Sequence, residues 1–277
     1  MPNPTEEFTR LVEIVAMLRG PEGCPWDREQ TLQSLSQFVL EEAYEVVDAI
    51  ERGDLTALGE EIGDHIFEGV LLAQIASDMG AFGVADSLRA VSDKLVRRHP
   101  HVFKDDGQVH DAASKERAPS AEAALSRWDT QKARDRAAAG QTGTKLGGLP
   151  KSLPALLGAY KLGKRAAAVG FDWPQATDVV DKIEEEVTEL HETLARDWSD
   201  VARREEEMGD LLFAIANLSR KLGVEPEAAL RGANQKFTKR FTAMESRIAE
   251  SGRKMTDMTL EELEAEWVRA KAEQQTD

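Results

Sequence analysis

The sequence predicts an all-α fold built from two tandem, duplicated helical-bundle domains, and three observations support this prediction. Apolar residues recur at helical spacing in most segments, whereas the alternation of a β-strand is hard to find. One acidic motif occurs twice, which indicates that a whole structural unit is duplicated. A chain of 277 residues, with 41% hydrophobic and 31% charged residues, is long enough for two globular domains of ordinary size.

The first predicted domain covers residues 1–138, and its helices are separated by helix-breaking residues. A cluster with the sequence GPEGCPWD follows the first helix, Gly53 ends the second, and Asp54 or Thr56 caps the third. Residues 99–120 have the composition of a loop. The predicted helices of this domain cover residues 4–19, 31–52, the stretch from the Asp54 or Thr56 cap to residue 79, 84–98 and 121–138.

Residues 139–150 are rich in Gly and small polar residues, which is typical of a linker between domains. The second predicted domain covers residues 151–277. Its two acidic helices lie between a turn at GFDWP and a turn at GVEP. The other predicted helices lie near 152–169, at 225–250 and in the final LEELEAEWVRAKAE segment, so we expect about six helices in each half.

The acidic motif of the second half lies within residues 182–210. Glu185, Glu186 and Glu189 lie on the first acidic helix, and Glu207 and Asp210 lie on the second. Residues three or four apart share one face of a helix, so each set forms an acidic row. Neighbouring apolar residues are expected to pack the two helices antiparallel and so to bring the rows together: Ile183, Val187, Leu190, Leu194, Met208, Leu211, Leu212 and Ile215.

Converging carboxylates repel one another, and burying unpaired charge is costly, so such a cluster requires protons or a cation. A hard divalent ion is the natural partner, because Mg²⁺ prefers oxygen ligands and often bridges carboxylates to the phosphates of a substrate. The sequence therefore predicts a Mg²⁺ site, in which Mn²⁺ can substitute.

The repeat includes more than the carboxylates of the second half. The first half carries Glu41, Glu42, Glu45, Glu61 and Asp64, which precede their counterparts by 144 residues in the first helix and 146 in the second. A basic pair four residues apart also recurs, as Lys94 and Arg98 and then as Lys236 and Arg240. Trp128 and Trp267 follow in the same order. An acidic cluster, two cations and an indole would suit a nucleotide, with phosphates on the cations and the base on the ring.

Composition excludes several other classes of protein. A formal net charge of −16 argues against a general nucleic-acid-binding surface, because such surfaces use Lys and Arg to neutralise phosphates. The N-terminus is unlike a signal peptide, no apolar run is long enough to span a membrane, and the single cysteine, Cys24, excludes an internal disulfide framework. We expect a cytoplasmic protein.

The doubled E-E-x-x-E and E-x-x-D motifs, together with KFxxR, closely resemble the MazG family of nucleoside triphosphate pyrophosphohydrolases. The similarity covers nearly the whole chain, including GCPWD, RRHPHVF and EEEMGDLLFA. The resemblance implies a homodimer that uses Mg²⁺ to cleave nucleoside triphosphates between the α- and β-phosphates, which yields a nucleoside monophosphate and pyrophosphate. No residue set for one base can be recognised, so we expect broad specificity that includes deoxynucleotides.

The resemblance also implies roles for individual residues. Four match the metal ligands of the family: Glu186, Glu189, Glu207 and Asp210. Glu185 matches the first acid of the motif, which we expect to position or activate water. Lys236, Arg240 and Trp267 match substrate-contacting positions, and we add Lys182 and Arg203 because each lies four residues before a ligand.

We expect the C-terminal copy to be the main catalytic one. The N-terminal copy reads GDHIFE where the C-terminal copy reads GDLLF, although it keeps Glu42, Glu45, Glu61 and Asp64. Its activity stays open.

Two other functions deserve comparison with this prediction. A di-iron carboxylate bundle would require Glu-x-x-His on two helices, and none of the five histidines has a Glu three residues before it. A non-catalytic, metal-dependent nucleotide sensor or scaffold would use the same ligands as the hydrolase, so the sequence leaves this alternative open.

Overall fold

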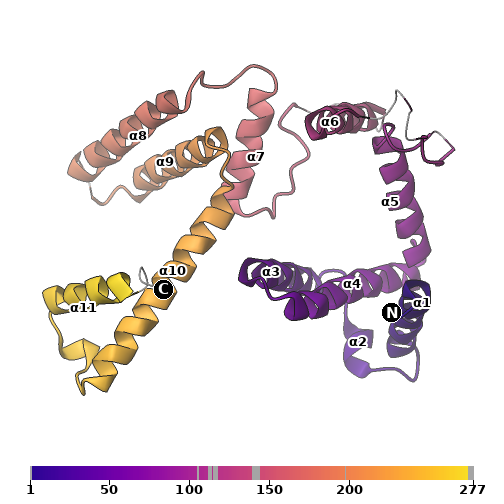
Figure 1. The fold of residues 1–277 in the computed structure, drawn as a ribbon, viewed down its shortest axis with the longest axis horizontal. Coiled ribbons are helices and arrows are strands. Elements are labelled where there is room, and N and C mark those ends of the chain that lie inside the picture. The colour runs from indigo at the N-terminus through magenta and orange to yellow at the C-terminus, as the bar shows by residue number, and fades with distance from the viewer. Residues whose placement is uncertain are drawn as a thin grey trace. The chain divides into compact units, whose positions relative to one another are not determined.

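The structure is a computed structural model, and it describes residues 2–104, 106–111, 114, 118–138, 144–196 and 198–273. Within these ranges the secondary structure consists of helices joined by loops (Figure 1). The described residues form no β-strand, and Phe103 and Val109 form an isolated β-bridge. The all-α prediction is therefore confirmed. Among the described helices, none has the length and apolarity that a membrane crossing requires.

In chain order the α-helices are α1 (Pro4–Arg19), α2 (Pro25–Glu29), α3 (Ser36–Arg52), α4 (Leu55–Asp78), α5 (Val84–Arg98), α6 (Ala121–Ala138), α7 (Ala155–Ala167), α8 (Ala176–Arg196), α9 (Val201–Lys221), α10 (Pro226–Glu250) and α11 (Leu260–Glu273). A short 3₁₀ helix at Met255–Asp257 precedes α11. The chain divides into unit 1, Met1–Gln141, and unit 2, Thr142–Asp277. This division falls within the predicted linker at 139–150, of which residues 139–143 lie outside the described ranges, and the exact domain bounds stay a prediction.

Unit 1 is built around the antiparallel pair α3 and α4, with α1 packed on α4. Its buried core contains Val15 of α1, Leu35, and Val70, Leu71 and Ile75 of α4. After this core, α5 follows α4 and packs against α6. The core of unit 1 therefore includes residues on or next to both helices that carry the N-terminal acidic motif.

The starts of the helices in unit 1 depend on local polar contacts. Asp54 caps α4, because its Oδ1 accepts hydrogen bonds from the backbone N–H groups of Thr56 and Ala57. The expected start of the first acidic helix at residue 31 is wrong, since α3 begins at Ser36. Thr31 and Ser34 instead exchange side-chain to backbone hydrogen bonds, at 2.9 and 3.1 Å, and form a turn before the helix.

In unit 2, α8 and α9 pair as consecutive antiparallel helices, and α7 packs on α9 (Figure 1). Close approach between α7 and α9 requires Gly163, since a Cβ there would lie 2.1 Å from Oδ1 of the buried Asn217. Further along the chain, α10 packs against α7 and α11. Met244, Ile248 and Ala270 form a small core between α10 and α11.

The turn before α8 is tied to the end of α9 by a group of charges. Asp172 accepts hydrogen bonds from Arg220 at 3.1 and 2.5 Å and from Lys221 at 2.8 Å. The hydrogen bond from Arg220 is the main reason that the pKa of Asp172 is lowered to about 2. These bonds fix how α8 enters its pairing with α9.

Eight apolar residues were expected to pack α8 against α9, and this prediction is wrong for four of them. Val187, Met208, Leu212 and Ile215 are between 38% and 44% exposed, so they lie on the outer surface of the helix pair. The buried positions are instead the small or acidic residues Val179, Glu186, Thr193, Glu207 and Ala214. Part of the apolar surface that was expected between α8 and α9 is therefore exposed on this helix pair.

Candidate metal centre

The two acidic helices of unit 2 bring three of the predicted metal ligands together. Glu186 of α8 and Glu207 and Asp210 of α9 each offer one carboxylate oxygen, and these atoms all lie within 4.8 Å of one another. Glu186 is 4% exposed and Glu207 is 1% exposed, whereas Asp210 is open to solvent. The cluster therefore has a buried base and one exposed side.

Two basic residues balance this cluster, each from a position one turn earlier on the same helix. Lys182 contacts Glu185 and Glu186, both at 2.8 Å. Arg203 contacts Glu206 at 3.0 Å and also pairs with Glu207. The hydrogen bonds that Lys182 donates to Glu185 and Glu186 raise the pKa of Lys182. The expectation that Lys182 and Arg203 face the acidic cluster is thus confirmed, although whether they bind substrate stays a prediction.

The carboxylate of Glu207 is in an environment that disfavours its negative charge. Burial is the main cause that raises its pKa, and the nearby carboxylates of Glu189 and Glu186 raise it further, while Arg203 acts in the opposite direction. Additional positive charge at this place would relieve the repulsion.

A divalent cation fits the donor set of this cluster. Oε2 of Glu186 is buried and has no hydrogen-bond partner, because Lys182 contacts the other oxygen. Oε1 of Glu207 is also buried, and its charge partner is Arg203. Buried oxygen atoms with unused lone pairs are what a hard cation requires.

Glu189 lies next to the cluster and at the edge of a cavity. Its carboxylate lies near that of Glu207 and raises the pKa of Glu207. The cavity has a volume of about 290 Å³ and is lined by Glu189, Glu192, Thr193, Arg196, Asp200 and Arg203. Glu185 is exposed like Asp210, with 55% of its side chain accessible, and unlike the buried Glu186 and Glu207. A cavity lined in part by the two arginines Arg196 and Arg203 therefore lies beside the acidic cluster.

The remaining predicted substrate residues form a second group, on α10 and α11. The guanidinium of Arg240 lies over the ring of Trp267, 5.9 Å from its centroid, and the ring of Phe237 is 5.1 Å from the same indole. Lys236 is exposed one turn before Arg240. Unit 1 has a matching pair, with Arg98 lying 5.6 Å from the ring of Trp128. The recurrence of this contact supports the repeat read from the sequence.

Sequence reasoning missed Glu266, which anchors the helix that carries Trp267. Glu266 is 2% exposed, and three arginines surround it: Arg247, Arg253 and Arg269. The hydrogen bond from Arg253 is the main reason that its pKa is lowered. The sequence alone gives no sign that Glu266 is buried and surrounded by arginines, because these arginines are spread over 23 positions of the chain.

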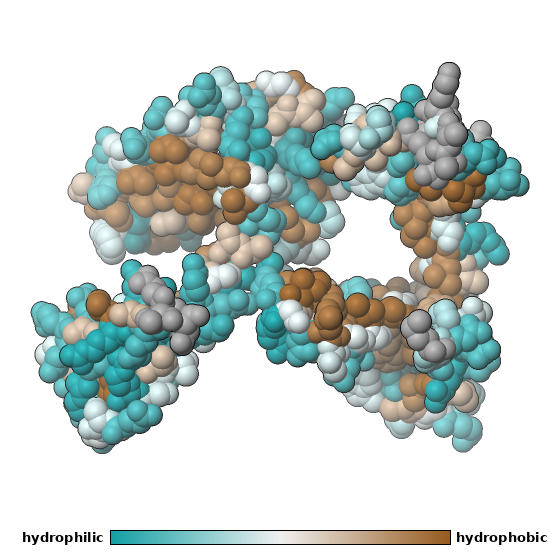
Figure 2. Space-filling model, viewed as in Figure 1, coloured by the Kyte–Doolittle hydropathy of each residue, from teal (hydrophilic) through white to brown (hydrophobic). Residues whose placement is uncertain are grey.

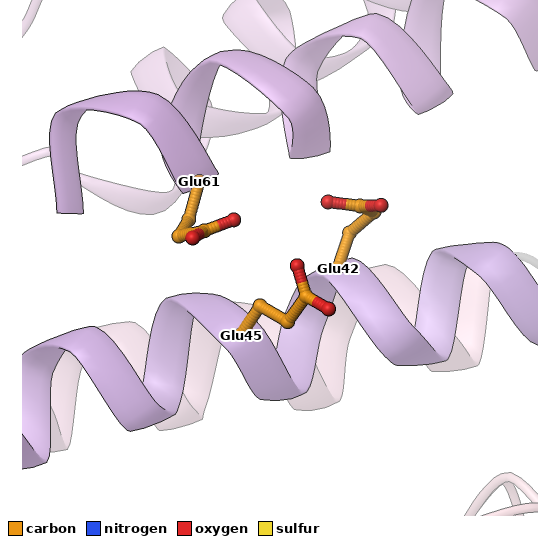
Figure 3. Close-up of side chains that lie close together, drawn as sticks. All are labelled: Glu42, Glu45 and Glu61. Carbon is orange, nitrogen blue, oxygen red and sulfur yellow. The ribbon is translucent and has the colours of Figure 1, made fainter. Parts of the chain in front are cut away.

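Unit 1 contains a corresponding acidic cluster. Glu42 and Glu45 of α3 and Glu61 of α4 offer carboxylate oxygens that all lie within 4.8 Å of one another, and Figure 3 shows the three side chains pointing into the space between the helices. Burial raises the pKa of Glu42 and of Glu61, and the nearby Glu45 raises both further. The N-terminal copy of the motif therefore also brings carboxylates from two helices together.

Comparisons with known proteins agree with this duplicated site. The model of the MazG nucleotide pyrophosphohydrolase domain matches residues 30–103 and again residues 175–243. A nucleoside triphosphate pyrophosphohydrolase from Escherichia coli (strain K12) is 44% identical over 97% of this chain and 98% of its own length. A nucleoside triphosphate pyrophosphohydrolase/pyrophosphatase MazG from Thermotoga maritima is 40% identical over 97% of both chains. The chain therefore belongs to the MazG nucleotide pyrophosphohydrolase family.

Proposed function

We propose that this chain is a nucleoside triphosphate pyrophosphohydrolase that cleaves ribo- and deoxynucleoside triphosphates between the α- and β-phosphates. The observation that carries this proposal is the cluster of Glu186, Glu207 and Asp210, in which the two glutamates are buried, one carboxylate oxygen of Glu186 has no partner, and two cations lie beside the acids. The full-length similarity to enzymes named for this activity supports it.

Glu186, Glu189, Glu207 and Asp210 would hold the divalent ion, for which Mg²⁺ is our first choice and Mn²⁺ a substitute. A bound ion of this kind neutralises triphosphate oxygens and lowers the pKa of a coordinated water. Glu185, which is exposed and accepts a hydrogen bond from Lys182, would orient the attacking water and accept its proton as the water oxygen bonds to the α-phosphorus. This step breaks the bond between the α-phosphorus and the bridging oxygen, and the products are a monophosphate and pyrophosphate.

The basic residues neutralise the substrate in this proposal. Lys182 and Arg203 now pair with Glu186 and Glu207, and an ion bound to those acids would release both cations for phosphate oxygens. Lys236 and Arg240 contribute further positive charge from α10. The indole of Trp267 offers a surface for any base, which favours broad specificity.

The decisive experiment separates the products of purified protein incubated with each nucleoside triphosphate and Mg²⁺. We expect monophosphate and pyrophosphate, and we expect Glu207→Gln to lower the rate at least about 100-fold, as is usual when charge stabilisation is removed. Glu205→Gln is the matched control, because Glu205 is an exposed acid on the same helix. Release of orthophosphate, or equal activity of both variants, would refute the assignment. Binding of nucleotide without any product would favour the sensor or scaffold instead.

We assign the main activity to unit 2. The positions in unit 1 that match Lys182 and Arg203 are Phe38 and Ala57, so the N-terminal cluster lacks the cations that would receive phosphate. Arg98 is also engaged, since it contacts Asp135 at 2.8 Å. Glu61→Gln should therefore leave pyrophosphate release within about twofold of the unaltered protein, in contrast to Glu207→Gln.

We also propose a homodimer in which the apolar face of α8 and α9 is covered by the same face of a second copy. Val187, Met208, Leu212 and Ile215 lie on this face, and Figure 2 shows hydrophobic surface gathered over these two helices. Leu212→Asp should convert the dimer to a monomer in size-exclusion chromatography with light scattering. Val201→Asp, at an exposed position at the start of α9, should not. A monomer before any substitution would contradict the proposal.

Two further expectations belong to this function. Nucleoside triphosphates are cytoplasmic, so we place the protein there and expect a role in maintaining the nucleotide pool or in a stress response. The net charge of −16 supports the expectation that nucleic acid is not a partner.

A further inference from the structure

The helix that carries Trp267 packs on unit 2 through a small apolar core. Along the chain α11 follows α10, and the two helices lie against each other (Figure 1). Met244 and Ile248 of α10 and Ala270 of α11 are the buried residues of this core, and Trp267 is partly buried against it. A core of this size gives limited stabilisation from burial, so the polar contacts of α11 also bear on its orientation.

The carboxylate of Glu266 makes polar contacts with three segments of the chain. Its Oε1 accepts hydrogen bonds from Arg253 at 2.7 Å and from Arg269 at 3.0 Å. Its Oε2 is buried without a hydrogen-bond partner and lies 3.7 Å from Nη1 of Arg247. Arg247 is on α10, Arg253 lies in the connection between the two helices, and Arg269 is on α11. Glu266 therefore joins α11 to α10 and to the connection before it.

The negative charge of Glu266 compensates cations that are themselves partly removed from water. The side chain of Arg247 is 25% exposed, and its Nη1 is buried without a hydrogen-bond partner. Arg247 also pairs with Glu273, but that carboxylate is largely exposed at the end of α11. A neutral side chain at position 266 would leave partly buried guanidinium groups without their main anion, which is strongly unfavourable. Loss of this charge should therefore loosen the docking of α11 on α10.

The next residue, Trp267, contacts α10 at a different place. The centroid of its indole lies 5.1 Å from that of Phe237 and 5.9 Å from the guanidinium carbon of Arg240, whereas Glu266 pairs with Arg247. Arg240 and Arg247 are about two turns apart on α10, or about 10 Å at a rise of 1.5 Å per residue. Two contacts separated in this way fix both the position and the rotation of α11, so Glu266 bears on where the indole lies relative to Arg240.

We propose that Glu266 is a positioning residue for nucleotide binding, because it holds α11 on α10 and so keeps the indole of Trp267 beside Arg240. The identity of the ligand rests on the proposed function of unit 2, whereas the positioning rests on the contacts of Glu266 itself. Glu266 lies among arginines of α10 and α11, and the metal cluster is on α8 and α9. Its loss should therefore weaken the binding of substrate and leave the rate of the bound substrate nearly unchanged.

Steady-state kinetics with ATP and Mg²⁺ tests the proposal. Glu266→Gln should raise KM about 10-fold, as loss of base stacking does, and should change kcat less than about twofold. Glu266→Asp keeps the charge and should recover part of the loss. Glu264→Gln is the matched control, since Glu264 is an exposed acid on the same helix, and both constants should stay within about twofold. A KM of Glu266→Gln equal to that of the control would overturn the proposal.

A double-mutant cycle separates the positioning of Trp267 from a general loss of structure. Trp267→Leu removes the group through which Glu266 acts, so adding Glu266→Gln to this variant should raise KM by less than about a further twofold. The full increase in the Trp267→Leu background would show that Glu266 acts by another route, and it would refute the positioning of the indole.

Hydrogen–deuterium exchange measures the docking of α11 without any nucleotide. Glu266→Gln should speed exchange in peptides of α11 by at least about fivefold and leave α8 and α9 unchanged, whereas Glu264→Gln should change neither. Unchanged exchange of α11 in Glu266→Gln would overturn the proposal even in a protein that releases pyrophosphate. Faster exchange of α11 in a protein that releases none would support the role of Glu266 in docking and would refute the proposed function alone.

Discussion

Asp172→Asn is expected to loosen the helix pair that carries the catalytic cluster, because Asp172 links the start of α8 to the end of α9. Its carboxylate accepts hydrogen bonds from Arg220 and Lys221, and all three side chains are largely buried, with 22%, 10% and 16% exposed respectively. Asparagine keeps the shape of the side chain but cannot neutralise two cations. The substitution therefore leaves both cations in a partly buried place without their anion.

The magnitude follows from the pKa of the Asp172 carboxyl. Folding lowers this pKa from 3.8 to about 2, and each unit corresponds to about 1.4 kcal/mol, so the ionised group contributes about 2 kcal/mol of stability. Since the folded pKa is the lower one, the contribution is complete above the unfolded pKa and is lost as the pH falls. It should decrease to about half near pH 3 and nearly vanish by about pH 2.

Hydrogen–deuterium exchange of peptides from α9 measures this stability separately from that of unit 1. At pH 7, Asp172→Asn should lower the opening free energy of α9 by about 2 kcal/mol, and at pH 3 by about 1 kcal/mol. The control is Asp181→Asn, an exposed position on α8, which should change it by less than about 0.5 kcal/mol. Equal effects of the two variants, or a loss that is the same at both pH values, would refute the electrostatic explanation.

Three further predictions concern packing, capping and substrate. Gly163→Ala should destabilise unit 2 by about 1–3 kcal/mol in thermal unfolding, because its Cβ would meet the buried Asn217; an unchanged melting temperature would mean that α7 can move freely. Asp54→Ala should cost about 1 kcal/mol in a denaturant titration, since α4 loses its cap, and no change would contradict that role. Trp267→Leu should raise KM about 10-fold across nucleotides, whereas Trp198→Leu, at an exposed position between α8 and α9, should not, and equal KM values of the two variants would argue against stacking.

The fold could be predicted well from the sequence, because helical periodicity is strong in both halves and the motif repeats. Short elements could not. The five-residue helix α2 lies within the cluster of breakers, where Pro25 begins it, and five residues are too few for a period to be recognised. The late start of α3 depends on side-chain hydrogen bonds of Thr31 and Ser34, for which helix propensity gives no indication.

The site could be predicted in part, and the limits have physical causes. Acids three or four positions apart on two adjacent helices were enough to predict that Glu186, Glu207 and Asp210 meet. Periodicity shows that a helix has an apolar face but not which neighbouring helix covers that face. The sequence therefore places Leu212 between α8 and α9, whereas in the structure it is 44% exposed. Glu68 of α4 is only 7% exposed, and a lone acid outside the motif gives no indication in the sequence that it is buried.

Each acidic cluster is supplied by two helices that follow one another directly in the chain, α3 with α4 and α8 with α9. Such pairing needs only contacts between residues close in sequence, which form quickly and early. On a ribosome, the first cluster would be complete before the second pair of helices has been synthesised. The repulsion among these carboxylates would thus act on the nascent N-terminal half before unit 2 has folded.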